Sequence, residues 1–471
     1  MAQPLPVKVL EVCRVAPPPD LPNLASPSSL PLTFFDILWL RFPPVERLFF
    51  YEFSSSNTPF FDSIIPKLRH FLSLTLQHYL PLAGNLVWPQ DSHKPFIKYV
   101  DGDGVSLTIA ESNMDFYHLS GNGFREATEC RPLIPHLEES HERVAVVALQ
   151  ITLFPNSGFC IGITSHHAVL DGKTSTSFVK SWAYICNKNG RSGSADPPPS
   201  WPSLPPDLTP FYDRAAIKDP AELEVIYLKG WLKQGGPNNR SLTLMKAQVQ
   251  PSLVRATFEL SGEQIQKLRN FVSADQNRSK HQVQRISTFS LVLGYTFVCL
   301  QRAIEAKEKN AILGFSVDSR SRLKPTIPST YFGNCISGCI VVPETEKVLR
   351  EKYGVCYVAE AISESIKGLE NGVLNGAETW VSIINQAMDQ GESKQRMMSV
   401  AGSPRFEVYS TDFGFGRPRK VEIASIDKTE AVNLSESRNG NGGVEIGLVL
   451  NVQQMRSFAS LFAKVLEEEV H

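Results

Sequence analysis

A run of residues rich in glycine, serine and proline divides the chain near its middle. It covers residues 187–210 and includes three consecutive prolines at 197–199. Proline lacks the backbone N–H that helices and central strands need, so this run cannot lie inside either. A chain of 471 residues also exceeds what one hydrophobic core usually supports. We therefore expect two domains, residues 1–190 and 221–471, joined by a linker at 191–220.

Apolar patterning on both sides of this linker alternates between the periods of helix and strand. Two apolar runs flank a Pro-Asn-Ser-Gly turn at residues 155–158, which predicts a β-hairpin. Other segments have the apolar spacing of amphipathic helices or of strands. The expected helices are residues 60–80, 173–186, 261–272, 287–308 and 451–469, and the expected strands are 255–260 and 311–318. The mixture predicts an α/β fold with mixed sheets flanked by helices.

Composition and charge restrict the classes of partner. Hydrophobic residues make up 42% of the chain, charged residues 20%, and the formal net charge is −1. Nucleic-acid binding usually demands a basic surface, so we expect neither nucleic acid nor a membrane as partner. The longest apolar run, residues 289–300, is too short to span a bilayer, and no targeting segment is evident. The eight cysteines form no Cys-x-x-Cys pair, so we expect a cytoplasmic protein without a metal site.

The segment at residues 159–172 carries the clearest chemical signal. Apolar and β-branched residues lead to His166 and His167, and Asp171 and Gly172 follow. Neighbouring strand side chains point to opposite faces, so one histidine can face a cavity while the other is held in the protein body. An ordinary imidazole has a pKa of about 6.5 and can take up a proton near neutral pH. His167 is therefore a candidate general base, with Asp171 available to fix the loop.

A second motif, nearer the C-terminus, strengthens this interpretation. Residues 412–416 read Asp-Phe-Gly-Phe-Gly. Together the two segments resemble the paired motifs of the plant BAHD acyltransferases, His-x-x-x-Asp-Gly in mid-chain and a later Asp-Phe-Gly-Trp-Gly. Phe415 stands where that family usually has tryptophan, so a hydrogen bond from an indole N–H cannot form here. The resemblance implies two chloramphenicol-acetyltransferase-like domains with a channel between them.

The resemblance also implies roles for individual residues. His167 would remove a proton from an acceptor hydroxyl as its oxygen attacks an acyl-CoA thioester. In the family an arginine pairs with the aspartate of the histidine motif, and by motif position this pair is Arg320 with Asp171. We count Asp171 and Asp412 with His167 as the catalytic set, although the family's second motif is mainly structural and shapes the CoA passage. The residues expected to support the site are Arg320, Gly172, Gly414 and Gly416.

A third segment suggests the substrates. Residues 331–335, Tyr-Phe-Gly-Asn-Cys, match a motif typical of the BAHD subgroup that acylates flavonoid and other phenolic glycosides, often with malonyl-CoA. The resemblance thus implies malonyl transfer from malonyl-CoA, a co-substrate, to a sugar hydroxyl of a phenolic or flavonoid glucoside. Lys173 and Lys180 are candidate partners for the malonyl carboxylate, although solvated helix lysines are the simpler interpretation. Ser287 and Thr288 are candidate CoA-binding residues, with helix capping as their other use.

Several alternatives remain open. The same fold would also suit acetyl-CoA or a hydroxycinnamoyl-CoA as donor. A condensation-type amide-forming module shares the doubled histidine and Asp-Gly, although the later Asp-Phe-Gly-Phe-Gly disfavours it. A non-catalytic ligand-binding protein on the same scaffold is disfavoured by the intact His167. We expect a monomer without a tightly bound cofactor.

Overall fold

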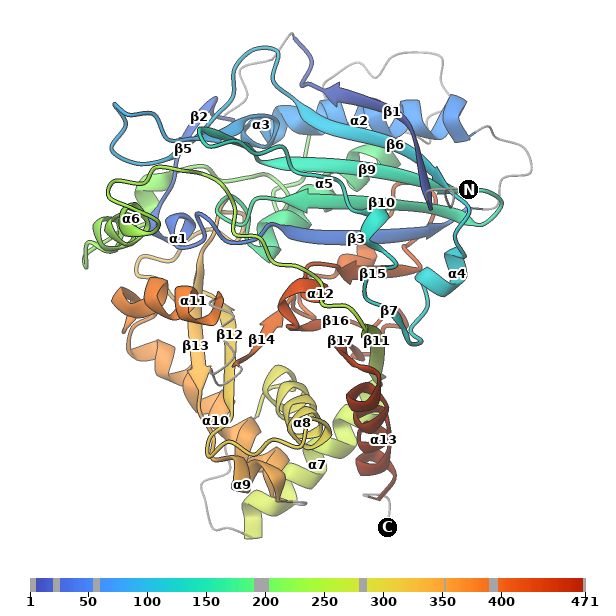
Figure 1. Ribbon diagram of the computed structural model, residues 1–471, viewed down its shortest axis with the longest axis vertical. Helices are drawn as coiled ribbons and strands as arrows, with labels where there is room; N and C mark the ends of the chain where they lie inside the picture. The colour runs from blue at the N-terminus through green and yellow to red at the C-terminus, as the bar shows by residue number, and fades with distance from the viewer. Residues whose placement is uncertain are drawn as a thin grey trace.

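The computed structural model of the protein has two lobes, and each lobe contains one large sheet (Figure 1). The described residues are 6–19, 26–53, 60–189, 203–278, 286–350, 353–388 and 397–468. Residues 191–202 of the expected linker lie outside them. Two large hydrophobic cores correspond to the two lobes, which is what a chain of this length requires.

Six strands form the sheet of the upper lobe. In spatial order they are β1 (Val7–Val15), β6 (Val105–Ser112), β9 (Val147–Phe154), β10 (Gly158–Ser165), β3 (Val45–Glu52) and β15 (Lys420–Ile423). β9 and β10 pair antiparallel across the turn at 155–158, which confirms the predicted hairpin. A four-stranded sheet lies beside it, made of β2 (Ser29–Pro31), β5 (Phe96–Lys98), β4 (Asn85–Val87) and β8 (Arg143–Ala145).

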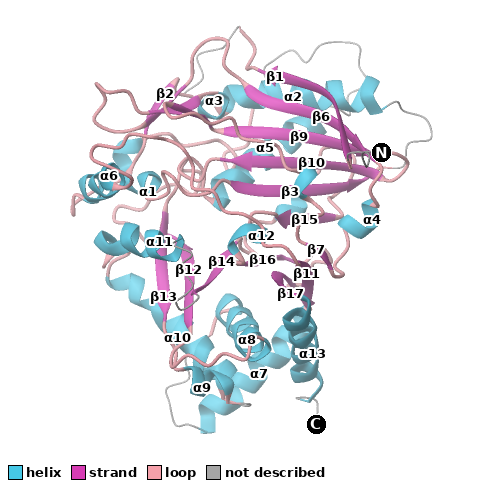
Figure 2. Cartoon of the chain, in the orientation of Figure 1, coloured by secondary structure: helices cyan, strands magenta, loops and turns pink. Residues whose placement is uncertain are grey.

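Helices accompany the upper sheet. They are α1 (Phe34–Ile37), α2 (Ile65–His78), α3 (Leu80–Ala83), α4 (Phe116–Leu119), α5 (Gly172–Asn189) and α6 (Leu223–Lys233). The long helices α2 and α5 lie behind the strands in Figure 2 and pack on each other. Trp182 of α5 is fully buried there, and its indole N–H donates to the Leu68 carbonyl of α2 at 3.1 Å. This contact fixes the helix that follows the histidine motif.

Seven strands form the sheet of the lower lobe. In spatial order they are β13 (Ile336–Val341), β12 (Ile312–Asp318), β14 (Met397–Ala401), β16 (Val432–Glu436), β17 (Val444–Asn451), β11 (Leu253–Leu260) and β7 (Arg125–Glu126). The helices of this half are α7 (Gly262–Arg278), α8 (Thr288–Ala303), α9 (Thr345–Leu349), α10 (Gly354–Gly368), α11 (Trp380–Met388), α12 (Ile426–Thr429) and α13 (Val452–Glu468). A capping box opens α7, because Ser261 and Gln264 exchange hydrogen bonds of 2.8 and 3.2 Å. Within the described ranges, no helix is both long and apolar enough to cross a membrane.

Two short strands cross between the lobes. β15, from the C-terminal half, pairs antiparallel with β3, and β7, from the N-terminal half, pairs with β11. Arg125 of β7 and Glu422 of β15 form a buried ion pair. Each large sheet thus ends in a strand from the other half, an exchange that the division into residues 1–190 and 221–471 did not foresee. Strands of two and four residues are too short to show a period in the sequence.

Candidate active site

The hairpin delivers the two histidines to different environments. The His166 N–H continues the sheet by donating to the Val146 carbonyl at 2.9 Å, and its ring is fully buried. Nδ1 of His166 accepts from the Ala168 N–H at 3.1 Å, and burial lowers the pKa of this ring to about 3. The ring of His167 is only half-buried. His166 therefore braces the turn, and His167 is the more exposed of the two histidines.

Aromatic rings surround the His167 imidazole. Trp39 stacks on it with ring centroids 4.2 Å apart, and Phe42 meets it edge-on at 5.4 Å. Burial lowers the pKa of His167 to about 4, although its own backbone, Asp171 and Asn334 partly oppose the shift. The ring is therefore neutral at pH 7. Nδ1 is buried without a hydrogen-bond partner among the described residues.

The carboxylate of Asp171 is turned into the protein, where it pairs with Arg320. Oδ2 lies 2.8 Å from Arg320 Nη2 and also accepts from the Cys335 N–H at 3.2 Å. Oδ1 accepts from the Thr174 N–H at 2.8 Å, so Asp171 also caps the first turn of α5. The side chains of this pair are 1% and 2% exposed. The geometry expected for Arg320 and Asp171 is thus present, and it ties the two lobes together beside the histidine loop.

Asn334 is a site residue that the sequence did not single out. Its Nδ2 donates to the His167 carbonyl at 2.9 Å and to Asp36 Oδ1 at 3.1 Å. Its backbone N–H donates to the same Asp36 oxygen at 2.8 Å, and Asp36 is fully buried. This network holds the backbone of His167 from the opposite lobe. In sequence, Asn334 was only part of a Tyr-Phe-Gly-Asn-Cys match, because nothing there shows that three distant segments meet.

Asp412 holds its own loop and does not join the imidazole. Oδ1 accepts from the backbone N–H groups of Gly414 and Gly416 at 2.7 and 3.0 Å. The ring centroid of Phe415, in the same loop, lies 6.0 Å from that of Phe159, which is near the start of β10. His167 instead follows the end of β10. Eight strand residues separate these ends by about 25 Å. Counting Asp412 with the catalytic residues is therefore wrong, and its geometry is structural.

The other candidate ligand-binding residues have partners within the protein. The Ser287 hydroxyl accepts from the Ser290 N–H at 3.1 Å, and the Thr288 hydroxyl accepts from Arg269 at 2.9 Å. Ser287 therefore caps α8, and CoA binding by this pair stays a prediction. Nζ of Lys173 lies 2.9 Å from Oδ2 of Asp318, and Nζ of Lys180 lies 3.0 Å from Oε2 of Glu407. Both lysines are thus paired already, which weakens their candidacy for a malonyl carboxylate.

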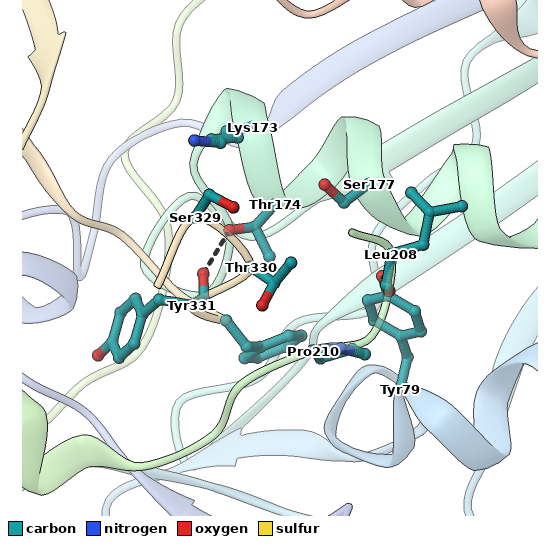
Figure 3. Close-up of a pocket in the computed structure, with 10 residues that line it drawn as sticks. Tyr79, Lys173, Thr174, Ser177, Leu208, Pro210, Ser329, Thr330 and Tyr331 are labelled. Atoms are coloured by element: carbon teal, nitrogen blue, oxygen red, sulfur yellow. Dashed lines mark hydrogen bonds between the residues drawn. The ribbon is translucent and has the colours of Figure 1, made fainter. Parts of the chain in front are cut away.

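Two cavities lie near α5, one lined by residues of its first turns and the other by Arg47, which bonds Thr176 of the helix. Figure 3 shows one of them, where Lys173, Thr174 and Ser177 of α5 face the segment at 329–332, and the Thr174 hydroxyl bonds the Tyr331 carbonyl at 3.4 Å. The other lies beside Arg47 and is bounded by β15, β16 and the segment at 402–408. His167 lines neither cavity, so a continuous channel to its ring stays a prediction.

Comparisons with known proteins place this geometry in a family. Residues 7–465 match the model of the Transferase family. The chain is 41% identical to phenolic glucoside malonyltransferase 1 of Arabidopsis thaliana over 98% of both chains. It is also 41% identical to malonyl-CoA:anthocyanidin 5-O-glucoside-6''-O-malonyltransferase of the same plant, again over 98% of both.

A solved structure shows the same fold. The crystal structure of vinorine synthase superposes with a TM-score of 0.68, covering 97% of this chain and 98% of that one at 18% sequence identity. This likeness confirms the predicted α/β architecture. With the family match over nearly the whole length, it shows that the chain belongs to the BAHD acyltransferases of the Transferase family.

Proposed function

We propose that this acyltransferase moves a malonyl group from malonyl-CoA to a sugar hydroxyl of a phenolic or flavonoid glucoside. The observation that carries the proposal is the 41% identity, over nearly full length, to two relatives whose names specify malonyl transfer to glucosides. The half-buried and neutral imidazole of His167 supports the proposal, because such a reaction needs a base beside the hydroxyl.

The proposed reaction is a direct transfer. Nε2 of His167 takes the proton of the sugar hydroxyl while the hydroxyl oxygen attacks the thioester carbonyl carbon. The new C–O bond forms first, the C–S bond then breaks, and the imidazolium returns the proton to the departing thiolate. General-base assistance of this kind is worth roughly 10²–10⁴-fold in rate. Holding both substrates beside one imidazole adds the advantage of proximity.

Asp171 has a positioning role in this mechanism. Its oxygens are occupied by Arg320 and by the N–H groups of Thr174 and Cys335. A carboxylate bound in this way holds the loop that carries His167 and is not free to orient the imidazole. This arrangement differs from a serine-protease triad, in which the aspartate contacts the histidine ring.

Product analysis tests the proposal. The purified protein is incubated with malonyl-CoA and a panel of phenolic and flavonoid glucosides, and mass spectrometry follows the products. We expect a glucoside carrying one malonyl group and one free CoA thiol per product formed. Transfer from acetyl-CoA or a hydroxycinnamoyl-CoA, but not from malonyl-CoA, would refute the malonyl assignment. Absence of transfer from all three donors would refute the proposed function.

A further inference from the structure

Two neighbouring residues of the segment at 331–335 hold the histidine turn at both of its ends. Nδ2 of Asn334 donates to the His167 carbonyl at 2.9 Å. The backbone N–H of Cys335 donates to Oδ2 of Asp171 at 3.2 Å. The chain that leads into β13 therefore fixes both the residue that carries the imidazole and the aspartate that follows it in the motif.

The amide of Asn334 is anchored by a buried carboxylate. Oδ1 of Asp36 accepts from Nδ2 of Asn334 at 3.1 Å and from its backbone N–H at 2.8 Å. Oδ2 of Asp36 accepts from the backbone N–H and the hydroxyl of Thr33 at 3.0 and 2.9 Å. Asp36 and Asn334 are both fully buried. Both neighbours of the amide nitrogen are acceptors, so the Asn334 side chain is held in one orientation.

The backbone beside Asn334 belongs to the same network. Nη1 of Arg214 lies 3.5 Å from Oδ2 of Asp36 and donates to the Phe332 carbonyl at 2.7 Å. Gly333 has a φ of +126°, and a Cβ at this position would collide with Arg214. Glycine adopts this backbone conformation without strain. Gly333 therefore lets the chain approach the buried carboxylate closely enough for Asn334 to bind it.

The imidazole itself has little polar support. The carboxylate of Asp171 is turned away from it into the protein. Nδ1 of His167 is buried without a hydrogen-bond partner among the described residues. The ring is packed instead by Trp39 and Phe42. Its orientation therefore depends on these two aromatic rings and on the backbone that Asn334 holds.

One short stretch of the chain supports both the ring and the amide. Asp36 belongs to α1, and the backbone N–H of Trp39 donates to its carbonyl at 3.0 Å. Trp39 stacks on the imidazole, while the side chain of Asp36 binds Asn334. The same turn of the chain thus sets the His167 ring directly and the His167 backbone through Asn334.

We propose that Asn334, anchored by Asp36, is a positioning residue for acyl transfer. It holds the His167 backbone so that the imidazole stands where proton removal requires it. The inference rests on the proposed function, in which His167 is the base. It gives the segment at 331–335 a role in the rate of transfer, whereas the sequence match alone connected this segment with the class of substrate.

Steady-state kinetics of Asn334→Ala test the inference. Both kcat and KM are measured with the acyl-CoA that the wild type accepts and with several glucosides. We expect kcat to fall roughly 10–100-fold, because a displacement of about 1 Å at a reacting group can cost 10²-fold. The factor should be the same for every glucoside, and each KM should change less than about threefold. Asp36→Asn keeps the shape of the anchor but weakens the acceptor, so it should lower kcat by a smaller factor.

Gln150→Ala is the matched control. Gln150 is also a buried amide, 6% exposed, and its Nε2 donates to the Pro132 carbonyl at 2.8 Å. Each variant removes an amide that donates to a backbone carbonyl, so both should lower the melting temperature. The control should change kcat by less than about threefold, because Gln150 does not bind the histidine turn.

A double-mutant cycle with His167→Ala separates positioning from a general disturbance of the protein. If Asn334 acts through the imidazole, adding Asn334→Ala to His167→Ala should change the remaining rate by less than about twofold. A general disturbance would lower that rate by the same factor as it lowers the wild-type rate.

The outcomes separate this inference from the proposed function. An unchanged kcat in Asn334→Ala, a loss confined to KM, an equal loss of kcat in Gln150→Ala, or equal losses with and without His167 would each overturn the role of Asn334. None of these results would affect the proposed function, provided that the wild type transfers malonyl. A His167→Ala variant that works at the wild-type rate would instead remove the proposed base, and this inference with it.

Discussion

At His167, burial lowers the pKa of a ring that the proposed reaction uses as a base. Stacking against Trp39 removes water from the ring and lowers its pKa to about 4. A lower pKa makes a weaker base, but it also guarantees that the ring is unprotonated at every pH from about 5 upward. Asn334 holds the His167 carbonyl, so the ring is presented from a fixed backbone. The site thus combines a weakly basic imidazole with a backbone that Asn334 holds in place.

The lowered pKa of His167 predicts an unusual pH profile. In the folded protein the active, neutral ring should persist until the pH falls to about 4, whereas an ordinary histidine would protonate near 6.5. We expect kcat/KM to stay level from pH 8 down to about 5 and to fall only below that. Circular dichroism at each pH separates protonation from unfolding. An acid limb centred near 6.5 would contradict the described environment.

Residues of the site differ in how far the sequence reveals them. His167 and Asp171 stand in one short motif, so their proximity follows from chain geometry, and Arg320 follows from the family resemblance. Arg47 and Asn334 contact the same loop from segments more than a hundred residues away in either direction. In sequence, Arg47 is one of three charged residues of β3, and only the packed structure shows that it bonds Thr176 and has no carboxylate partner among the described residues.

At the scale of elements, the junction between β10 and α5 depends on close packing at Gly172. A Cβ placed there would lie 2.6 Å from Cε2 of Phe406, a ring that lines the cavity beside Arg47. Phe406 belongs to the C-terminal half, so this glycine allows the two lobes to approach at the motif. The expected supporting role of Gly172 has this steric basis.

Gly172→Ala should therefore destabilise the protein and disturb the cavity. We expect the free energy of unfolding to fall by about 1–3 kcal/mol, because the methyl group overpacks against Phe406. Gly338→Ala is the control, since a Cβ there meets no atom within 4 Å. It should change stability by less than about 0.5 kcal/mol. If Gly172→Ala matches this control in urea denaturation, the close approach has no energetic importance.

Most helices and long strands were predictable from their periodicity. Residues 451–469 show the apolar spacing of an amphipathic helix, and the structure has α13 at Val452–Glu468. The buried helix α8 was predictable from its long apolar run and not from a period. The position of the Asp-Phe-Gly-Phe-Gly loop was harder to predict, because its two glycines show only that the backbone turns. Its position at the far end of β10 depends on aromatic contacts with Phe159.

For the whole molecule, the exchanged strands join the lobes through buried charges. Glu422 of β15 pairs with Arg125 of β7 and lies 3.5 Å from Arg255, which also binds Asp427 at 2.7 Å. All four side chains are at most 2% exposed. Chain length and the proline-rich run predict two domains, but the bounds 1–190 and 221–471 stay a prediction, and α6 of the second range packs in the core of the upper lobe. The strand exchange was not predictable, because strand partners distant in sequence leave no local pattern.

Breaking this cluster should weaken the whole protein. Glu422→Gln leaves Arg125 buried without its partner, and we expect a loss of about 3–5 kcal/mol in the free energy of unfolding at pH 7. Glu52→Gln is the control, because Glu52 pairs with Arg419 at a site where the glutamate is 44% exposed. That variant should lose at most about 1 kcal/mol. Equal losses in the two variants would show that the buried cluster adds nothing.

The same cluster predicts a dependence of stability on pH. Paired arginines hold the pKa of Glu422 below its ordinary value of 4.5. Its contribution is therefore complete above pH 4.5 and is lost as the pH falls through the lower folded-state value. The wild type should lose this contribution on acidification, and Glu422→Gln, which lacks the carboxylate, should not. Urea denaturation at a series of pH values measures the difference.

The most direct test of the account is the turnover rate of His167→Ala with malonyl-CoA and an accepted glucoside. The account predicts a fall in kcat of roughly 10²–10⁴-fold in a protein that remains folded. A variant that transfers malonyl at the wild-type rate would show that this imidazole is not the base, and the central claim would be wrong.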